Sequence, residues 1–163
     1  MCPPHSTLTR LSVVLENRPS DTVQTIRQGV KYIAVAKPTI MFVEDDPEIL
    51  ETGADALRAA GFRVIEATDG QRALQEAISR KLDLIIMDVS MPQVGGVEAC
   101  HCLKAMPKTQ KVPVVLTAAK KDPAAKKLGE RMHGSVRVLR KPFTGEDLVS
   151  VARSVVKPKS LLL

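Results

Sequence analysis

The chain has 163 residues, of which 44% are apolar and 26% charged, as expected for a globular protein with one domain and some additional chain. Aromatic residues make up only 2%, so a single-strand nucleic-acid platform that stacks bases on aromatic rings is not expected. No apolar run reaches the roughly 20 residues of a membrane-spanning helix. The three cysteines do not form a disulfide framework, so we expect a cytoplasmic protein without membrane contact.

The net charge of +6 is unevenly distributed along the chain. Residues 1–38 carry a net charge of +3, residues 39–103 of −7 and residues 104–163 of +10. The basic part is a candidate docking face, at residues 120–155, for an acidic protein partner, with direct nucleic-acid binding as the less favoured alternative. A solvated surface with no partner is the alternative interpretation.

Residues 1–37 are expected to form an N-terminal extension that is largely disordered, because its first part is rich in proline and has little periodicity. A short helix is predicted at 21–34, where Val23, Ile26, Val30 and Ile33 share one helical face. Gly29 weakens that prediction. The helix would pack on the domain or on a partner, while a frayed extension or an over-long start is the slightly favoured alternative.

From Pro38 onward, the pattern alternates between short apolar runs and amphipathic segments. The predicted strands cover 39–43, 62–66, 82–87, 112–116 and 136–139, and the predicted helices cover 47–60, 70–78, 97–105, 123–132 and 144–155. This alternation predicts an α/β domain at 38–156, a doubly wound five-stranded parallel sheet in the order 2-1-3-4-5, followed by a tail at 157–163.

Carboxylates follow two of the predicted inner strands. Asp88 ends the run Leu84–Met87, and Glu44, Asp45 and Asp46 follow the run Ile40–Val43. The carboxyl ends of neighbouring parallel strands meet at the crevice where open α/β sheets bind ligands. Carboxylates gathered there repel one another unless a cation or a proton intervenes. The sequence therefore predicts a Mg²⁺-assisted site around Asp88.

Four segments, each at a predicted strand end, together resemble the receiver domain of two-component response regulators, the CheY-like family. They are Met41–Pro47 (MFVEDDP), Leu84–Pro92 (LIIMDVSMP), Val114–Ala118 (VVLTA) and Leu139–Phe143 (LRKPF). The resemblance implies a flavodoxin-like fold with five helices. It also implies a phosphorelay protein that receives a phosphoryl group from a histidine kinase or phosphotransfer protein and signals through protein contacts, rather than an enzyme.

The resemblance also implies roles for individual residues. Asp88 would be the phosphorylated residue. The Mg²⁺ ligands would be Glu44, Asp45, Asp88 and the backbone carbonyl of Ser90. The phosphoryl group would be bound by Thr117 and Lys141, with the small Ala118 leaving the acceptor open to a donor. Family members often have a cis peptide bond between such a lysine and proline.

The sequence departs from the family at Val138, where the family usually has an aromatic residue that moves inward on activation. A receiver-like scaffold that binds partners without phosphorylation is therefore the alternative function. No second domain is expected after Val156, which favours a stand-alone receiver, and homodimerisation stays open. A hydrolase of similar fold would need a general acid two residues after Asp88, where Ser90 stands. Cys100, His101 and Cys102 are adjacent on a predicted helix and point in different directions, so they are not expected to bind a metal.

Overall fold

A computed structural model of the chain describes residues 21–24, 33–132 and 135–156. In chain order its elements are β1 (Asp21–Gln24), β2 (Ile33–Ala36), β3 (Thr39–Val43), α1 (Pro47–Ala59), β4 (Arg63–Ala67), α2 (Gly70–Ser79), β5 (Leu84–Asp88), α3 (Gly96–Ala105), β6 (Val114–Ala118), α4 (Pro123–Arg131), β7 (Val136–Arg140) and α5 (Gly145–Val155). From β3 onward, strands and helices alternate as predicted.

The strands β3 to β7 form one parallel sheet in the order β4-β3-β5-β6-β7. Counted from β3, this is the order 2-1-3-4-5, so the predicted fold is confirmed. Every residue of the inner strands β3, β5 and β6 is buried, which explains their continuous apolar runs. The edge strands β4 and β7 are partly exposed and contain charged residues.

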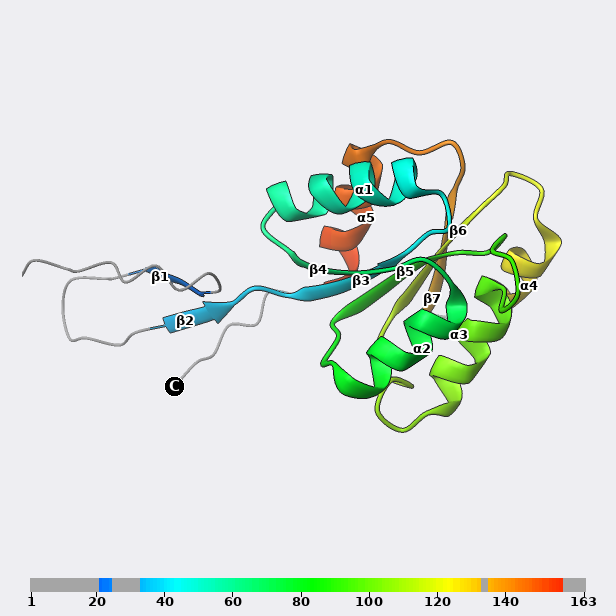
Figure 1. Ribbon diagram of the computed structural model, residues 1–163, viewed down its shortest axis with the longest axis horizontal. Coiled ribbons are helices and arrows are strands. Elements are labelled where there is room, and N and C mark those ends of the chain that lie inside the picture. Colours follow the sequence, from blue (N-terminus) through cyan, green and yellow to red (C-terminus); the bar gives the residue numbers. More distant parts are fainter. Residues whose placement is uncertain (1–20, 25–32, 133–134, 157–163) are drawn as a thin grey trace, which may run out of the picture.

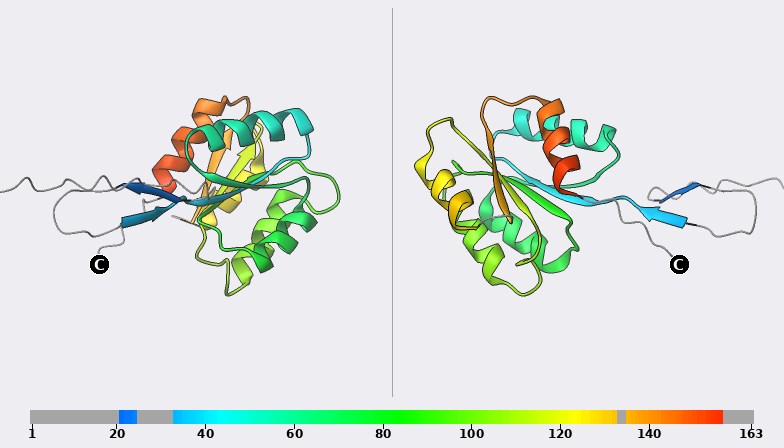
Figure 2. Two further views of the ribbon diagram at one scale, coloured as in Figure 1. Left: turned by 60° about the vertical axis from the view of Figure 1, so that its left-hand side comes forward. Right: turned by 180° about the vertical axis from the view of Figure 1, so that it is seen from behind.

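Helices cover both faces of this sheet (Figures 1 and 2): α1 and α5 lie on one face, and α2, α3 and α4 lie on the other. Successive side chains of a strand point to opposite faces. Ile40 and Phe42 of β3 therefore enter the core beneath α1 and α5, while Met41 and Val43 enter the core beneath the other three helices. The sheet is thus buried on both faces, and its ligand-binding positions are left at the strand ends.

Polar residues begin four of the helices just beyond the strand ends. The Asp46 carboxylate accepts hydrogen bonds from the backbone N–H groups of Glu48 (2.9 Å) and Ile49 (3.2 Å) and caps α1. Asp69 and Asp122 cap α2 and α4 in the same way, and Thr144 begins α5. These caps end the β3–α1 and β6–α4 loops within a few residues, at the edge of the sheet where Asp88 lies.

The strands β1 and β2 pair antiparallel, with Asp21 opposite Ala36 and Gln24 opposite Ile33. The predicted helix at 21–34 is therefore wrong at both of its ends. β-branched residues at both ends favour an extended chain over a helix, and Gly29 disfavours a helix interior. Residues 25–32 lie outside the described residues, as do 1–20, with their predicted disorder, and the tail at 157–163.

Candidate functional site

The carboxyl ends of β3, β5, β6 and β7 together form a compact polar site. Asp88 is the last residue of β5, and the sheet register places it opposite Thr117 of β6. Glu44 immediately follows β3, and its N–H donates to the Ala67 carbonyl (3.1 Å) at the end of the neighbouring strand. Lys141 follows β7, and its N–H donates to the Ala118 carbonyl (2.8 Å). Four separate strands thus bring together the predicted site residues Glu44, Asp88, Thr117 and Lys141.

Asp88 is 2% exposed, and three groups contact its carboxylate. The Lys141 Nζ lies 2.8 Å from Oδ1, and the Thr117 hydroxyl donates to the same oxygen at 3.4 Å. The Ser90 N–H donates to Oδ2 at 3.0 Å. Lys141 and Thr117 therefore fix the direction of Oδ1, and the Ser90 N–H fixes that of Oδ2.

Lys141 also pairs with the buried Glu44, whose Oε2 lies 3.1 Å from Nζ. Burial raises the pKa of Glu44 above its usual value and the nearby Asp88 charge raises it further, while Lys141 opposes both effects. Burial alone would lower the pKa of Lys141, but hydrogen bonds to Asp88 and Glu44 outweigh it and the pKa is raised. The ammonium group is therefore bound to both carboxylates.

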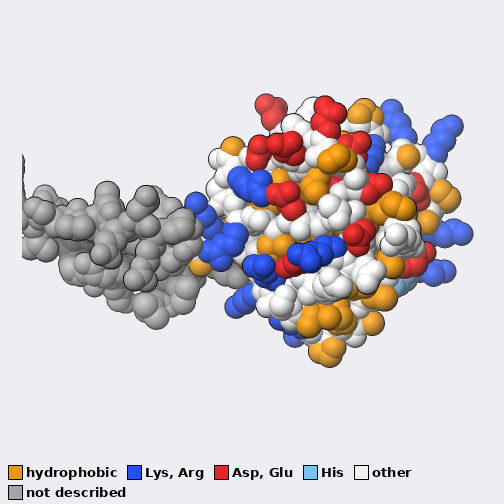
Figure 3. All heavy atoms as spheres, viewed as in Figure 1, with side chains coloured by type: hydrophobic (Ala, Val, Ile, Leu, Met, Phe, Trp, Pro, Cys, Tyr) orange, Lys and Arg blue, Asp and Glu red, His pale blue; other side chains and the backbone are white. Residues whose placement is uncertain are grey.

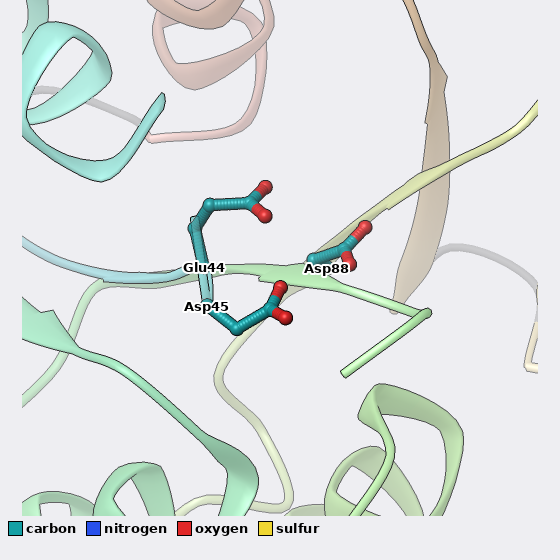
Figure 4. Close-up of side chains that lie close together, drawn as sticks. All are labelled: Glu44, Asp45 and Asp88. Atoms are coloured by element: carbon teal, nitrogen blue, oxygen red, sulfur yellow. The ribbon is translucent and has the colours of Figure 1, made fainter. Parts of the chain in front are cut away.

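Glu44, Asp45 and Asp88 bring their carboxylates together, as Figure 4 shows, and each offers an oxygen within 4.8 Å of the others. Three carboxylates beside one lysine leave an excess of two negative charges, which matches a divalent cation. Mg²⁺ binds hard oxygen ligands and keeps part of its water shell, so a site with one exposed carboxylate, Asp45, suits it. On α3, by contrast, Cys100 is buried and Cys102 is exposed, so these two side chains do not converge.

Gly96, at the start of α3, also lies at the site, although it belongs to none of the predicted site residues. A Cβ added to Gly96 would lie only 2.0 Å from the Asp88 carbonyl oxygen and 3.0 Å from the Val89 Cα. The Gly96 N–H donates to the Val89 carbonyl at 3.2 Å. A glycine is therefore required for α3 to approach the backbone of Asp88 so closely. The sequence signal is the Gly95-Gly96 pair that ends the loop after Asp88.

The remaining predicted positions surround the same edge. Ala118 is buried at the end of β6, while Ser90 is exposed in the loop after β5. The Lys141–Pro142 peptide bond is cis, as the resemblance implies. Val138 is half-buried, and its Cγ2 lies 3.4 Å from the position that a Cβ on Gly129 of α4 would occupy.

The sequence matches the family model for the response regulator receiver domain over residues 40–153. This match covers most of the chain, so the protein belongs to the response regulator receiver family of two-component signalling. Members of this family are signalling phospho-acceptors rather than classical enzymes, and they interact with histidine kinases or phosphotransfer proteins.

Individual relatives agree with this assignment. The transcriptional regulatory protein YrkP of Bacillus subtilis is 36% identical over 109 residues, which are 67% of this chain and 45% of YrkP. The transcriptional regulatory protein CpxR of Escherichia coli is 33% identical over 118 residues, 72% of this chain and 49% of CpxR. The chain thus spans about half the length of these relatives.

Solved structures extend the likeness to three dimensions. The chemotaxis protein CheY4 of Vibrio cholerae has a TM-score of 0.68 and 29% identity, covering 74% of this chain and all of CheY4 (100%). The receiver domain of the sensor histidine kinase PA1611 of Pseudomonas aeruginosa, which contains a magnesium ion in its active-site cleft, has a TM-score of 0.65 and 26% identity over 74% of this chain and 98% of its own. Among the described residues, no helix has the length and apolar character needed to span a bilayer.

Proposed function

We propose that Asp88 of this receiver accepts a phosphoryl group from the phosphohistidine of a kinase or phosphotransfer protein, in a Mg²⁺-dependent reaction. The observation that supports this most strongly is the contact set of Asp88. A buried carboxylate, 2% exposed, lies 2.8 Å from a lysine ammonium and within 3.4 Å of a threonine hydroxyl. Those are donors for the oxygens of a transferred phosphoryl group.

In the proposed reaction, one carboxylate oxygen of Asp88 forms a bond to phosphorus while the bond from phosphorus to the donor histidine nitrogen breaks. The electron pair of that bond stays on the imidazole, and Asp88 becomes an acyl phosphate. Lys141 already neutralises negative charge at Oδ1 and remains beside the phosphoryl oxygens. Thr117 redirects its hydroxyl from Asp88 to one of those oxygens, and the small, buried Ala118 beside it leaves space for them.

Glu44, Asp45, Asp88 and the Ser90 carbonyl are the residues proposed to hold the metal. When bound, Mg²⁺ supplies positive charge that neutralises the phosphoryl oxygens during transfer. Without it, the approach of an anionic donor to this acidic cluster is opposed by the carboxylates of Glu44 and Asp45. Lys141 alone cannot balance that charge, because it is already paired with two carboxylates.

The downstream signal is proposed to pass to a protein partner at the basic face formed by residues 120–155. Lys and Arg side chains gather at the right-hand edge of the molecule in Figure 3, over the end where α4 lies. On α4, Lys126 faces Glu130 at 3.9 Å, while Lys127 and Arg131 are exposed cations. An excess of cations here favours a partner with an acidic surface.

The proposal is tested by incubating the protein with acetyl phosphate and measuring its intact mass. With Mg²⁺, the wild type should gain one phosphoryl group, and with excess chelator it should not. Asp88→Asn should gain none. Asp46→Asn is the matched control, because it removes a neighbouring negative charge while asparagine still caps α1; this variant should be phosphorylated like the wild type. No modification of the wild type under saturating donor and Mg²⁺ would contradict the proposal and favour a scaffold that acts without phosphorylation.

A further inference from the structure

Val138 and Arg140 of β7 lie on the face of the sheet that α4 covers. Val136 packs in the same core as Leu128 of α4, and alternate residues of a strand share one face. Val138 faces Gly129 of α4. The valine side chain has no polar atom, so a side-chain hydrogen bond from this face of β7 to the loop before α4 has to come from another residue.

Arg140 makes such a contact. Its Nη1 donates to the carbonyl of Ala119, in the loop between β6 and α4, at 3.0 Å. The same carbonyl accepts the N–H of Asp122 at 3.1 Å. Asp122 is the N-cap of α4, and its carboxylate accepts from the N–H groups of Ala124 and Ala125, both at 2.9 Å. One carbonyl oxygen therefore joins the end of β7 to the first turn of α4.

The loop between β6 and α4 starts beside the proposed phosphorylation site. Thr117, two residues before Ala119, donates to Asp88 at 3.4 Å. Ala118 lies between Thr117 and Ala119, and its carbonyl accepts the backbone N–H of Lys141. Any residue at 141 except proline would make this contact. The Ala119 contact, in contrast, depends on the arginine side chain at 140. The identity of that residue therefore decides how the loop is attached to β7.

We infer that Arg140 is a positioning residue that couples the Asp88 site to α4 through the Ala119 carbonyl. This inference rests on the proposed function, because it concerns the structural consequences of phosphorylation. A phosphoryl group on Asp88 places acceptor oxygens and negative charge beside Thr117. As Thr117 moves toward those oxygens, Ala119 moves with it. Because the Ala119 carbonyl is bonded to both Arg140 and Asp122, the displacement reaches α4 instead of being absorbed in the loop.

The test compares backbone amide resonances of α4, residues 123–131, in ¹⁵N-labelled protein before and after addition of Mg²⁺ and beryllofluoride, which binds a carboxylate as a phosphoryl analogue. The wild type should show clear shifts there. Arg140→Met should reduce them by about half or more, and Arg140→Lys should restore most of the response, because its ammonium can donate to the same carbonyl. Arg137→Met is the matched control: it removes the same charge from β7, but Arg137 bonds to Ser154 Oγ of α5 (3.1 Å) and not to the loop.

A full α4 response in Arg140→Met, an equal loss in Arg137→Met, or no recovery in Arg140→Lys would overturn the inference. Arg140→Leu provides a second variant with the same expected loss if Arg140→Met does not fold. Intact mass after acetyl phosphate treatment separates failure of the coupling from failure of phosphorylation itself. If the wild type is not phosphorylated, the proposed function fails. If every variant is phosphorylated and α4 responds equally in all of them, only the role of Arg140 fails.

Discussion

Gly96→Ala should be far more damaging than an alanine substitution at a helical glycine usually is. The new Cβ would lie 2.0 Å from the Asp88 carbonyl oxygen and 2.8 Å from its carbonyl carbon. A carbon–oxygen contact normally requires about 3.3 Å, so α3 and the end of β5 must separate by roughly 1.3 Å. Both neighbours are backbone atoms that cannot rotate away. Overpacking of this kind costs about 1–3 kcal/mol and occasionally more, so we expect a loss of about 3 kcal/mol in the free energy of unfolding.

Gly129→Ala is the matched control, because Gly129 also lies within a helix but has more space. A Cβ added to Gly129 would lie 3.4 Å from the Val138 Cγ2, which is an ordinary contact. Alanine also has a higher helix propensity than glycine, by up to about 1 kcal/mol. Urea denaturation followed by far-UV circular dichroism measures both variants. Gly96→Ala should also accept less phosphate from acetyl phosphate, since Asp88 is displaced. Equal stability of Gly96→Ala and the wild type, or equal losses in both variants, would refute the steric reasoning.

Three further results are expected. Mg²⁺ at about a hundredfold its Kd should stabilise the wild type by about 2.7 kcal/mol, and Asp45→Asn should lose most of that gain in urea denaturation; an undiminished gain would remove Asp45 from the ligand set. The pKa of Lys141 is raised in the folded state, so its ion pairs contribute fully to the free energy of unfolding below the usual lysine pKa of 10.5. That contribution is lost as the pH rises through the higher folded-state pKa. Lys141→Met should therefore flatten the decline of the urea midpoint at alkaline pH. An unchanged decline would contradict the ion pairs. Burial raises the pKa of the Cys100 thiol to about 11, so iodoacetamide at mildly alkaline pH should modify the exposed Cys102 and spare Cys100 in the folded protein, as peptide mass spectrometry can show; equal labelling would mean that α3 opens readily.

The sheet could be predicted from the sequence because its inner strands are buried on both faces and appear as continuous apolar runs. The first and last residues of the strands could be predicted less well than the strands themselves. The run 82–87 predicts a strand that begins at Leu82, but β5 begins at Leu84, and the Asp83 carboxylate instead accepts the Thr39 N–H at 2.9 Å. The strand predicted at 112–116 lies two residues too early. β6 begins at Val114, after Pro113, which has no N–H to donate to the sheet.

The side chains at the site could be assigned to one edge of the sheet, since parallel strands bring their carboxyl ends together. Their contacts could not be predicted, because they join residues distant in sequence. The Lys141–Glu44 pair spans 97 positions, and the Arg140–Ala119 contact spans 21. The close approach at Gly96 likewise depends on how α3 packs, which local periodicity does not encode. The helix predicted at 21–34 failed for a local reason, because its apolar spacing competes with β-branched residues that favour strands.

The central claim, that Asp88 is the phosphoryl acceptor, is tested most directly by locating the phosphoryl group. The protein is treated with acetyl phosphate and Mg²⁺, and the acyl phosphate is reduced with borohydride, which converts a phosphorylated aspartate to homoserine. Peptide sequencing by mass spectrometry then identifies the converted residue. We expect homoserine at position 88, with Asp45 and Asp46 unmodified. Homoserine at position 45 or 46, with Asp88 intact, would contradict the role of Asp88 as the acceptor.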